Sequence, residues 1–389
     1  MAPNISARPV WATLTLLWLA GSGLRLTLLA VPPVLPLIHA DLNLSEVQVG
    51  ALGSLPTLLL ALAAIPGSLL IARFGVKTAL VVGLLMVGLG SAARGGATGI
   101  ASLYLATIVT AAGVAVMQPA MPPAVRAWIP ERIPLATAVY TNGLLVAEVL
   151  AVALTLPVIL PMVDGSWRLA FVVWGVPVLA IAAIIAIFAP GAPKIRVPQR
   201  WWPNWRDPLI WRLGFCLGCV NTCYFATNTF LPDYLHAMGR GDLVSGALTS
   251  LNLGQLPASF LMLAIAPRVV LKRWAYACVG LGNLACIAGI VLMPGDAVLI
   301  WSGLLGFSVA AGLILVLALA PLLGDPDDVH RLSAAIFTIS YPCAVLMSVI
   351  GGYAWDVTGL SWTAFMPIGF CAIVLAGLPF TIDFGRARR

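Results

Sequence analysis

Arg25 lies near the middle of an apolar run that extends from about residue 12 to residue 38, in the stretch GSGLRLTLLA. A guanidinium group keeps its charge and presents several N–H donors in one plane, which suits planar or linear acceptors held through two hydrogen bonds. Placing that charge at the centre of a bilayer costs at least about 2.5–3.5 kcal/mol, so something inside the protein must offset it. Arg25 lies about 14 residues from the start of the run, or roughly 21 Å at about 1.5 Å per residue, too deep to reach the headgroups comfortably.

Glu148, in VAEVL, is a carboxylate at about the same depth in the fifth apolar run. Three interpretations of these two residues stay open. In the first, Arg25 faces a water-filled cavity and anchors a small anion or an electron-rich planar solute. In the second, Arg25 and Glu148 form an internal ion pair that serves packing. In the third, Glu148 neutralises Arg25 while the site is empty and then yields to the solute or takes up a proton, which makes it a coupling candidate.

Other polar side chains at a similar depth are candidates to complete a binding site. Asn221 and Tyr224, for example, are three residues apart and share one face of a helix. The alternative for each candidate is an interhelical hydrogen bond, worth about 0.6 kcal/mol, without a role in binding. The predicted substrate-binding residues beside Arg25 are Gln118, Tyr140, Asn142, Asn221, Thr222, Tyr224, Gln255 and Tyr341.

Residues suited to catalysis or metal binding are not grouped in the sequence. The three histidines, His39, His236 and His330, lie near the ends of different apolar runs, and no H-E-x-x-H or G-x-S-x-G motif occurs. The cysteines of CLGCVNTC have a spacing that metal sites use, but their surroundings are apolar and contain no histidine. We therefore expect no enzyme activity, no metal and no cofactor. No G-x-x-x-x-G-K loop for a nucleotide occurs either, so solute movement would run on gradients.

Composition places the chain in a membrane. Hydrophobic residues make up 61% of the sequence and charged residues 9%, whereas a soluble protein carries about 25% charged residues. The apolar runs are roughly 18–28 residues long, enough to cross about 30 Å of hydrocarbon as helices, and they lack the alternation of barrel strands. We predict an all-α membrane protein with twelve spans, at residues 12–38, 46–72, 78–93, 99–122, 135–160, 167–189, 208–236, 243–266, 273–292, 297–322, 332–352 and 362–382.

The positions of lysine and arginine predict the orientation, because basic loops stay in the cytoplasm. With the N-terminus inside, the outer loops hold only Arg94, Arg168 and Arg240 of the 21 basic residues. Both termini then face the cytoplasm of a bacterial inner membrane. This topology, with anionic lipid headgroups as partners, explains the net charge of +7, so no nucleic-acid partner is expected. The predicted cytoplasmic residues are Arg8, Arg73, Lys77, Arg126, Arg132, Lys194, Arg196, Arg200, Arg206, Arg212, Arg268, Lys272, Arg273, Arg331, Arg386, Arg388 and Arg389.

The two halves of the sequence resemble each other. GALGSL at Gly50 returns as GALTSL at Gly246, and SWRLAF with Trp167 returns as SWTAF with Trp362, at nearly the same spacing. Each match falls in the equivalent span of its half, as expected for a duplicated unit of six helices. We predict three segments: an N-terminal six-helix bundle at 1–190, a proline-rich and tryptophan-rich cytoplasmic linker at 191–207, and a C-terminal six-helix bundle at 208–389.

The stretch SLLIARFGVK at 68–77 resembles the signature that the major facilitator superfamily carries between its second and third helices. Arg73, Gly75 and Lys77 match this gate motif, whereas Ala72 stands in place of its acidic residue. The resemblance extends over essentially the whole chain. Within the superfamily, the stretches LR at 24–25, GSWRLAFVVWGVP and HRLSAAIFTISYPCA are similar to the branch of cyanate permeases and 2-nitroimidazole transporters.

This resemblance implies the major facilitator fold, in which two pseudo-symmetric six-helix bundles enclose a midplane site, and a carrier that acts as a monomer. We expect an alternating-access secondary transporter for a cyanate-like or nitrite-like anion or a nitroimidazole, with Arg25 as the anchor and protons as a candidate coupling ion. The alternative is an exporter of neutral drug-like solutes, in which Arg25 and Glu148 form a structural ion pair.

Overall fold

Helices build the part of the chain that the structure describes, and this part contains no β-strand. The structure is a computed structural model that describes residues 9–44, 46–191, 201–293, 295–325 and 327–385. A first group of helices comprises α1 (Val10–Gly23), α2 (Val31–Leu42), α3 (Glu46–Gly95), α4 (Ile100–Trp128), α5 (Ile133–Leu154), α6 (Leu160–Met162) and α7 (Trp167–Phe188). A second group comprises α8 (Pro208–Ala237), α9 (Val244–Leu253), α10 (Gln255–Val269), α11 (Arg273–Leu292), α12 (Ala297–Leu323), α13 (Val329–Thr358) and α14 (Met366–Gly377).

The prediction of twelve membrane spans in two bundles is confirmed. Ten helices in the described residues are long and apolar enough to cross a membrane, and α1 and α2 are shorter apolar helices. Counting α3 as two spans, and α1 with α2 as one, gives the twelve predicted spans. The two spans of α3 meet at Gly75, where φ is 81° and ψ is 166°. Only glycine adopts that backbone conformation without strain, so Gly75 allows the chain to turn between the spans.

The first predicted span, 12–38, is interrupted, which corrects the prediction of one continuous helix. α1 ends at Gly23, residues 24–30 form turns, and α2 begins at Val31. Pro32 and Pro33 explain the interruption, because they lack the amide donors that would bond to the carbonyls of residues 28 and 29. Arg25 therefore projects from the interruption and not from a regular helix.

α1 and α5 pack with their backbones in direct contact. A Cβ atom on Gly21 would lie 2.1 Å from the carbonyl oxygen of Tyr140, and one on Gly143 would lie 2.3 Å from the carbonyl oxygen of Trp18. Any larger residue at either position would push the two helices apart. The contact holds the end of α1, just before Arg25, against the helix that carries Glu148.

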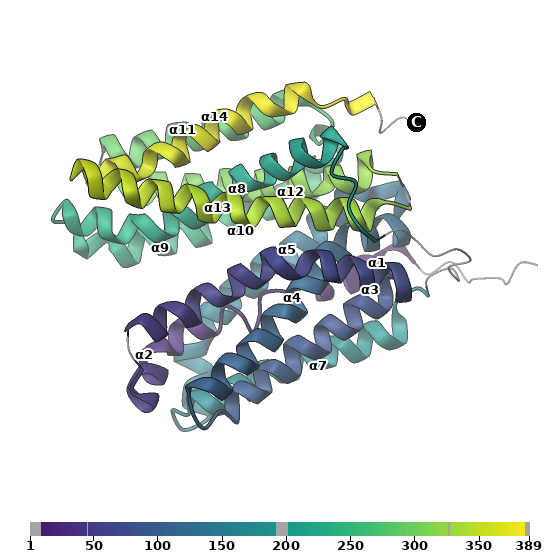
Figure 1. Cartoon of the computed structure of the whole chain (residues 1–389), viewed down its shortest axis with the longest axis horizontal. Helices are drawn as coiled ribbons and strands as arrows, with labels where there is room; N and C mark the ends of the chain where they lie inside the picture. Colours follow the sequence, from purple (N-terminus) through teal and green to yellow (C-terminus); the bar gives the residue numbers. More distant parts are fainter. Residues whose placement is uncertain (1–8, 45, 192–200, 294, 326, 386–389) are drawn as a thin grey trace, which may run out of the picture.

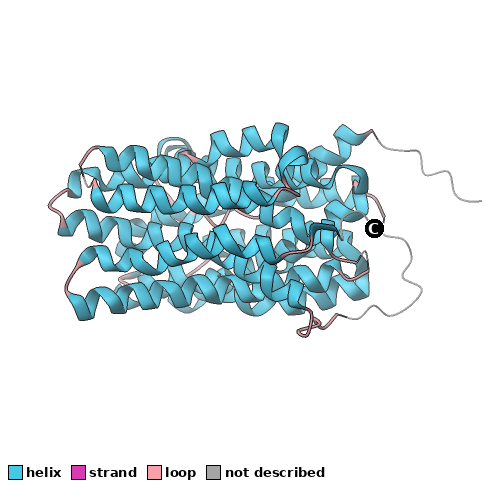
Figure 2. Cartoon of the chain, turned by 90° about the horizontal axis from the view of Figure 1, so that it is seen from above, coloured by secondary structure: helices cyan, strands magenta, loops and turns pink. Residues whose placement is uncertain are grey.

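The two groups of helices meet near the end of the molecule at which the C-terminus lies, which we call the linker end (Figure 1). Here Arg126 of α4 donates a hydrogen bond to the carbonyl of Pro321 in α12. Deeper in the molecule, Asn142 Nδ2 of α5 donates to Ser259 Oγ of α10 at 2.9 Å. In Figure 1 the groups spread apart toward the opposite end, where α2 and α9 lie. Figure 2 shows that the helices run along the long axis and that the connecting loops gather at the two ends.

Arg94 is buried completely, whereas the sequence suggests an outer loop. It lies in the last turn of α3, and its side chain points into the first group of helices, where it donates a hydrogen bond to Thr107 of α4. The other two predicted outer arginines are partly exposed, with Arg168 paired to Asp41 and Arg240 paired to Asp296. Seven of the basic residues on which the predicted orientation depends lie outside the described residues, namely Arg8, Lys194, Arg196, Arg200, Arg386, Arg388 and Arg389.

Candidate functional site

Arg25 and Glu148 lie opposite each other inside the molecule. Arg25 Nε is 4.0 Å from Glu148 Oε2, and the two side chains are 14% and 6% exposed. At this separation the charges attract, but the groups do not form a hydrogen bond. Within the described part of the chain the guanidinium group makes no hydrogen bond at all, so its N–H donors can serve a ligand. Tyr224 and Tyr341, from the second group of helices, are close enough to interact with its charge.

The Tyr224 hydroxyl connects Glu148 of α5 to Asn252 of α9. Its oxygen lies 2.6 Å from Glu148 Oε1 and 2.6 Å from Asn252 Oδ1. Asn252 Nδ2 donates to the carbonyl of Leu248 at 2.8 Å, which orients Oδ1 toward Tyr224. A hydroxyl has one proton, so Tyr224 can donate to only one of these two acceptors. All three groups are satisfied when Glu148 carries a proton and donates to Tyr224, which in turn donates to Asn252.

Amide side chains surround this connection in the second group of helices. Asn228 Nδ2 donates to the carbonyl of Tyr224 at 2.9 Å, and Asn252 Nδ2 lies 3.4 Å from Asn228 Oδ1. Gln255 Nε2 lies 3.5 Å from Asn252 Oδ1. Sequence reasoning missed Asn228, although it follows Tyr224 by four residues and so lies one helical turn further along the same face.

Aromatic rings form a second part of the site. The ring of Phe225 lies 5.1 Å from that of Tyr224 and 6.4 Å from that of Tyr341, measured between centroids. Gln118 of α4 lies close to the Tyr341 hydroxyl, so residues of both groups of helices meet here. The structure thus brings together six predicted residues from both groups: Arg25, Gln118, Glu148, Tyr224, Gln255 and Tyr341.

Two other predicted binding residues, Tyr140 and Asn142, take part in helix packing. Tyr140 is 2% exposed and lies in the contact between α1 and α5. Asn142 Oδ1 accepts a hydrogen bond from Trp18 Nε1 at 3.0 Å, while its amide nitrogen bonds to Ser259. Both polar groups of Asn142 are therefore used within the protein.

Asn221 and Thr222, on α8, have partners away from Arg25. Asn221 Nδ2 donates to Ser340 Oγ at 3.3 Å, which joins α8 to α13. Thr222 is fully buried, and its hydroxyl donates to the carbonyl of Gly218 in the same helix at 2.8 Å. Neither contact connects with the cluster around Arg25, so the structure does not bring these two residues to the other candidates.

The predicted gate motif lies within the first group of helices. Lys77 Nζ donates to the carbonyl of Ala189, just after α7, at 3.0 Å, whereas Arg73 is exposed. Gly75 makes the turn between the two spans of α3. Ala72 stands in place of the acidic residue of the motif, and Arg126, which is not part of the motif, makes a hydrogen bond that crosses to α12.

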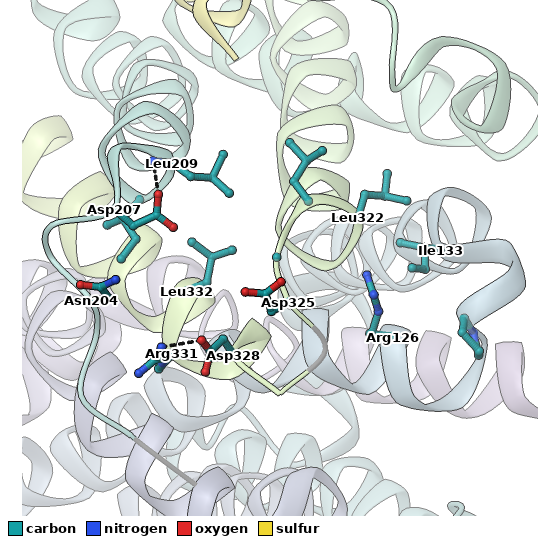
Figure 3. A pocket seen from close by; sticks show the side chains of 14 residues that line it. Arg126, Ile133, Asn204, Asp207, Leu209, Leu322, Asp325, Asp328, Arg331 and Leu332 are labelled. Carbon is teal, nitrogen blue, oxygen red and sulfur yellow. Dashed lines mark hydrogen bonds and ion pairs between the residues drawn. The ribbon is translucent and has the colours of Figure 1, made fainter. Parts of the chain in front are cut away.

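A cavity of about 960 Å³ lies at the linker end beside Arg126 (Figure 3). Charges of both signs line it, and among them Arg331 pairs with Asp328. Asp207 accepts a hydrogen bond from the amide of Leu209 at 3.0 Å and so caps α8. None of the predicted substrate-binding residues lines this cavity. It is therefore separate from the cluster around Arg25.

Three relatives resemble the chain along most of its length. An uncharacterized transporter, YycB, of Bacillus subtilis (strain 168) is 25% identical, covering 96% of this chain and 93% of its own. The 2-nitroimidazole transporter of Escherichia coli (strain K12) is 25% identical, covering 91% and 90%. The cyanate transport protein CynX of the same strain is 24% identical, covering 94% and 97%. These matches agree with the branch that the sequence motifs suggested.

Solved structures show the same fold. The human organic anion transporter MFSD10 matches with a TM-score of 0.75 at 14% identity, covering 96% of this chain and 100% of that one. The transporter FucP in its outward conformation matches with a TM-score of 0.68 at 17% identity, covering 98% and 99%. A family model described as the Major Facilitator Superfamily matches residues 17–343. With its duplicated bundles and polar residues gathered between them, the chain belongs to the Major Facilitator Superfamily, and it is a multi-pass membrane transporter and not an enzyme.

Proposed function

We propose that this transporter moves a small anion or a small polar nitrogenous solute, with Arg25 as the anchor of the bound molecule. The observation that supports the proposal is a guanidinium group between the two bundles whose donors have no hydrogen-bond partner among the described residues and whose nearest charge, Glu148, is 4.0 Å away. Cyanate and 2-nitroimidazole, the solutes in the names of two relatives, both offer electron-rich acceptor atoms. A planar donor group suits such acceptors.

The rings beside Arg25 extend this proposal to flat solutes. The ring of Phe225 contacts those of Tyr224 and Tyr341, and both tyrosines are close enough to the guanidinium group to interact with its charge. Aromatic faces bind planar rings through offset stacking, worth about 0.5–1.5 kcal/mol beyond the area that is buried. A nitroimidazole would then use both parts of the site, whereas a linear or triatomic anion would depend mainly on Arg25.

Glu148 is the residue that we assign to coupling. While it is ionised, it competes with an anion for Arg25; once it is protonated, it can donate to Tyr224 and leave the guanidinium group to the solute. Binding of the anion and binding of a proton therefore favour each other, as linkage requires. This supports symport of the solute with a proton.

The transport cycle that we propose is rocking of the two bundles about the Arg25 site. The bundles correspond to the predicted segments 1–190 and 208–389, joined by the linker 191–207. Opening toward the linker end requires that the bond from Arg126 to Pro321 and the bond from Asn142 to Ser259 break. We further propose that the linker end faces the cytoplasm of a bacterial inner membrane and that the protein acts as a monomer.

A second candidate function is export of neutral solutes. The observation that favours it is that Arg25 and Glu148 together carry no net charge, so a site in which both stay ionised would suit an uncharged molecule. In that case the pair is structural, and neither residue contacts the solute through its charge.

Uptake by reconstituted vesicles tests both functions. We expect R25K and R25Q each to lose uptake of radiolabelled cyanate and nitrite, because a lysine keeps the charge but not the paired donors. The matched control is R240Q, which removes a partly exposed arginine of the second group. Retention of anion uptake in R25Q, with R240Q behaving like the unaltered protein, would exclude Arg25 as the anchor. Proton-linked efflux of neutral solutes in R25Q would favour the second candidate function.

A further inference from the structure

Arg94 is a second arginine in the interior of the first bundle, and no carboxylate lies within ion-pair distance of it in the described residues. Its side chain is fully buried. Its Nε donates to Thr107 Oγ1 of α4 at 3.2 Å, and its Nη1 donates to the carbonyl of Thr27 at 3.2 Å. The guanidinium group also lies 5.6 Å from the ring centroid of Phe171 in α7. Arg94 thus joins α3, α4 and α7 to the segment that precedes α2.

The carbonyl of Thr27 belongs to the interruption of the first span. In a continuous helix it would accept from the amide of Val31, but residues 24–30 form turns and α2 begins only at Val31. The interruption therefore presents carbonyl groups in the interior of a membrane protein, where each needs a donor. Arg94 supplies the donor to one of them.

Stability alone is a poor explanation for this arginine. Nη2 of Arg94 and Oγ1 of Thr27 are buried and have no partner in the described part of the chain. A buried charge without a counter-charge is expensive, and apolar residues of similar volume often stabilise a protein more. The advantage of an arginine at this position is its planar group, which donates to two acceptors on different segments of the chain at once.

We infer that Arg94 is a positioning residue, which holds the interruption of the first span in place and thereby sets where Arg25 enters the binding site. Thr27 follows Arg25 by two residues in the turn segment 24–30. On the other side, the backbone contact between α1 and α5 fixes the residues just before Arg25. The chain is therefore held in place on both sides of Arg25, by the packing of α1 on α5 before it and by Arg94 after it. This inference rests on the proposed role of Arg25 in binding.

The matched variants for the test are T107V and T110V. Thr107 accepts the bond from Arg94, whereas Thr110, one turn further along α4, is equally buried and donates to Ala106 of its own helix. T107V therefore loosens Arg94 without removing its charge, and T110V makes the same chemical change without touching Arg94. R94M is the stronger variant, and T107V serves if R94M does not fold.

Two readouts that need no solute decide the inference. Hydrogen–deuterium exchange of peptides that cover residues 24–30 should be at least about tenfold faster in T107V and R94M than in T110V. Phenylglyoxal modification of Arg25, followed by peptide mass spectrometry, should change rate by at least about threefold in the same two variants, because the exposure of the guanidinium group changes. Unchanged exchange in T107V and R94M would overturn the inference, and so would faster exchange with an unchanged modification rate.

The dissociation constant for nitrite separates this inference from the proposed function. If Arg25 binds the solute, T107V should weaken nitrite binding by at least about tenfold, a loss of about 1.4 kcal/mol, and T110V should not. If no form of the protein binds nitrite or cyanate, the proposed function fails, and the exchange and modification rates still decide whether Arg94 positions Arg25.

Discussion

Replacing Glu148 with glutamine is the sharpest test of how the site couples a solute to protons. The variant E148Q keeps the shape of the side chain and a hydrogen-bond donor for Tyr224, but it cannot ionise. Unit charges 4.0 Å apart, the distance between Arg25 Nε and Glu148 Oε2, attract by about 4 kcal/mol at an effective dielectric constant of about 20. An anion that binds Arg25 must overcome this attraction whenever Glu148 is ionised.

The full attraction is an upper bound, because the site is partly open and the 14% exposed side chain of Arg25 retains some contact with solvent. We take about 1.4–2.8 kcal/mol, which corresponds to about 10- to 100-fold tighter binding of nitrite by E148Q than by the unaltered protein with Glu148 ionised.

Isothermal titration calorimetry of nitrite with E148Q and the unaltered protein measures this effect directly. The control is D233N, which removes an exposed carboxylate of α8 and should titrate like the unaltered protein. In vesicles, E148Q should still exchange nitrite across the membrane but should no longer accumulate it against a gradient. The reasoning fails if E148Q and the unaltered protein bind nitrite with the same affinity, or if E148Q still accumulates nitrite against a gradient.

Three further predictions concern Tyr224, Gly75 and Arg126. Y224F should reduce proton-driven accumulation of nitrite in vesicles by about tenfold, because it removes the hydrogen bond between Tyr224 and Glu148. It should change the nitrite dissociation constant by less than about threefold. Equal effects on accumulation and on the dissociation constant would contradict a role of Tyr224 in coupling. G75A should destabilise the protein by about 1–2 kcal/mol in thermal unfolding, since φ at this position is 81°, whereas G99A, with φ of −171° and open space around it, should be neutral. R126Q should speed maleimide labelling of an L332C reporter in the linker-end cavity by about tenfold or more. The reason is that R126Q removes a hydrogen bond from a charged group, worth about 1.5–3 kcal/mol. Labelling at the same rate would show that this bond does not hold the linker end closed.

The depth of a residue in the membrane could be predicted from the sequence, but the direction in which its side chain points could not. Arg25 and Glu148 lie at equal distances from the ends of their spans, and counting residues was sufficient to place them at one level. Tyr224 and Asn142 are polar residues at similar depths, yet Tyr224 reaches Glu148 and Asn142 bonds to Trp18 and Ser259. Which way each points depends on how neighbouring helices are rotated, and one sequence does not contain that information.

The structure corrects two predictions, the continuous first span and the outer-loop position of Arg94, and the two failed for different reasons. Pro32 and Pro33 were visible in the sequence and are sufficient to predict that a helix stops before them, so the interruption of the first span could have been found. Arg94 stands in GSAARGG, at the glycine-rich end of a span, where a loop is the ordinary expectation. Its burial results from packing against Thr107 and Phe171, on two other helices, and no local signal reports that.

The connection through Tyr224 has a consequence for how the specificity of such a protein can change. The charged residues, Arg25 and Glu148, come from one of the duplicated halves, while Tyr224 and Asn252 come from the other. If Arg25 anchors the solute as we propose, substitutions in the second half can alter the size and shape of the cargo and leave its charge preference unchanged. A chimera that exchanges only the C-terminal half would test whether charge preference and fit depend on different halves of the chain.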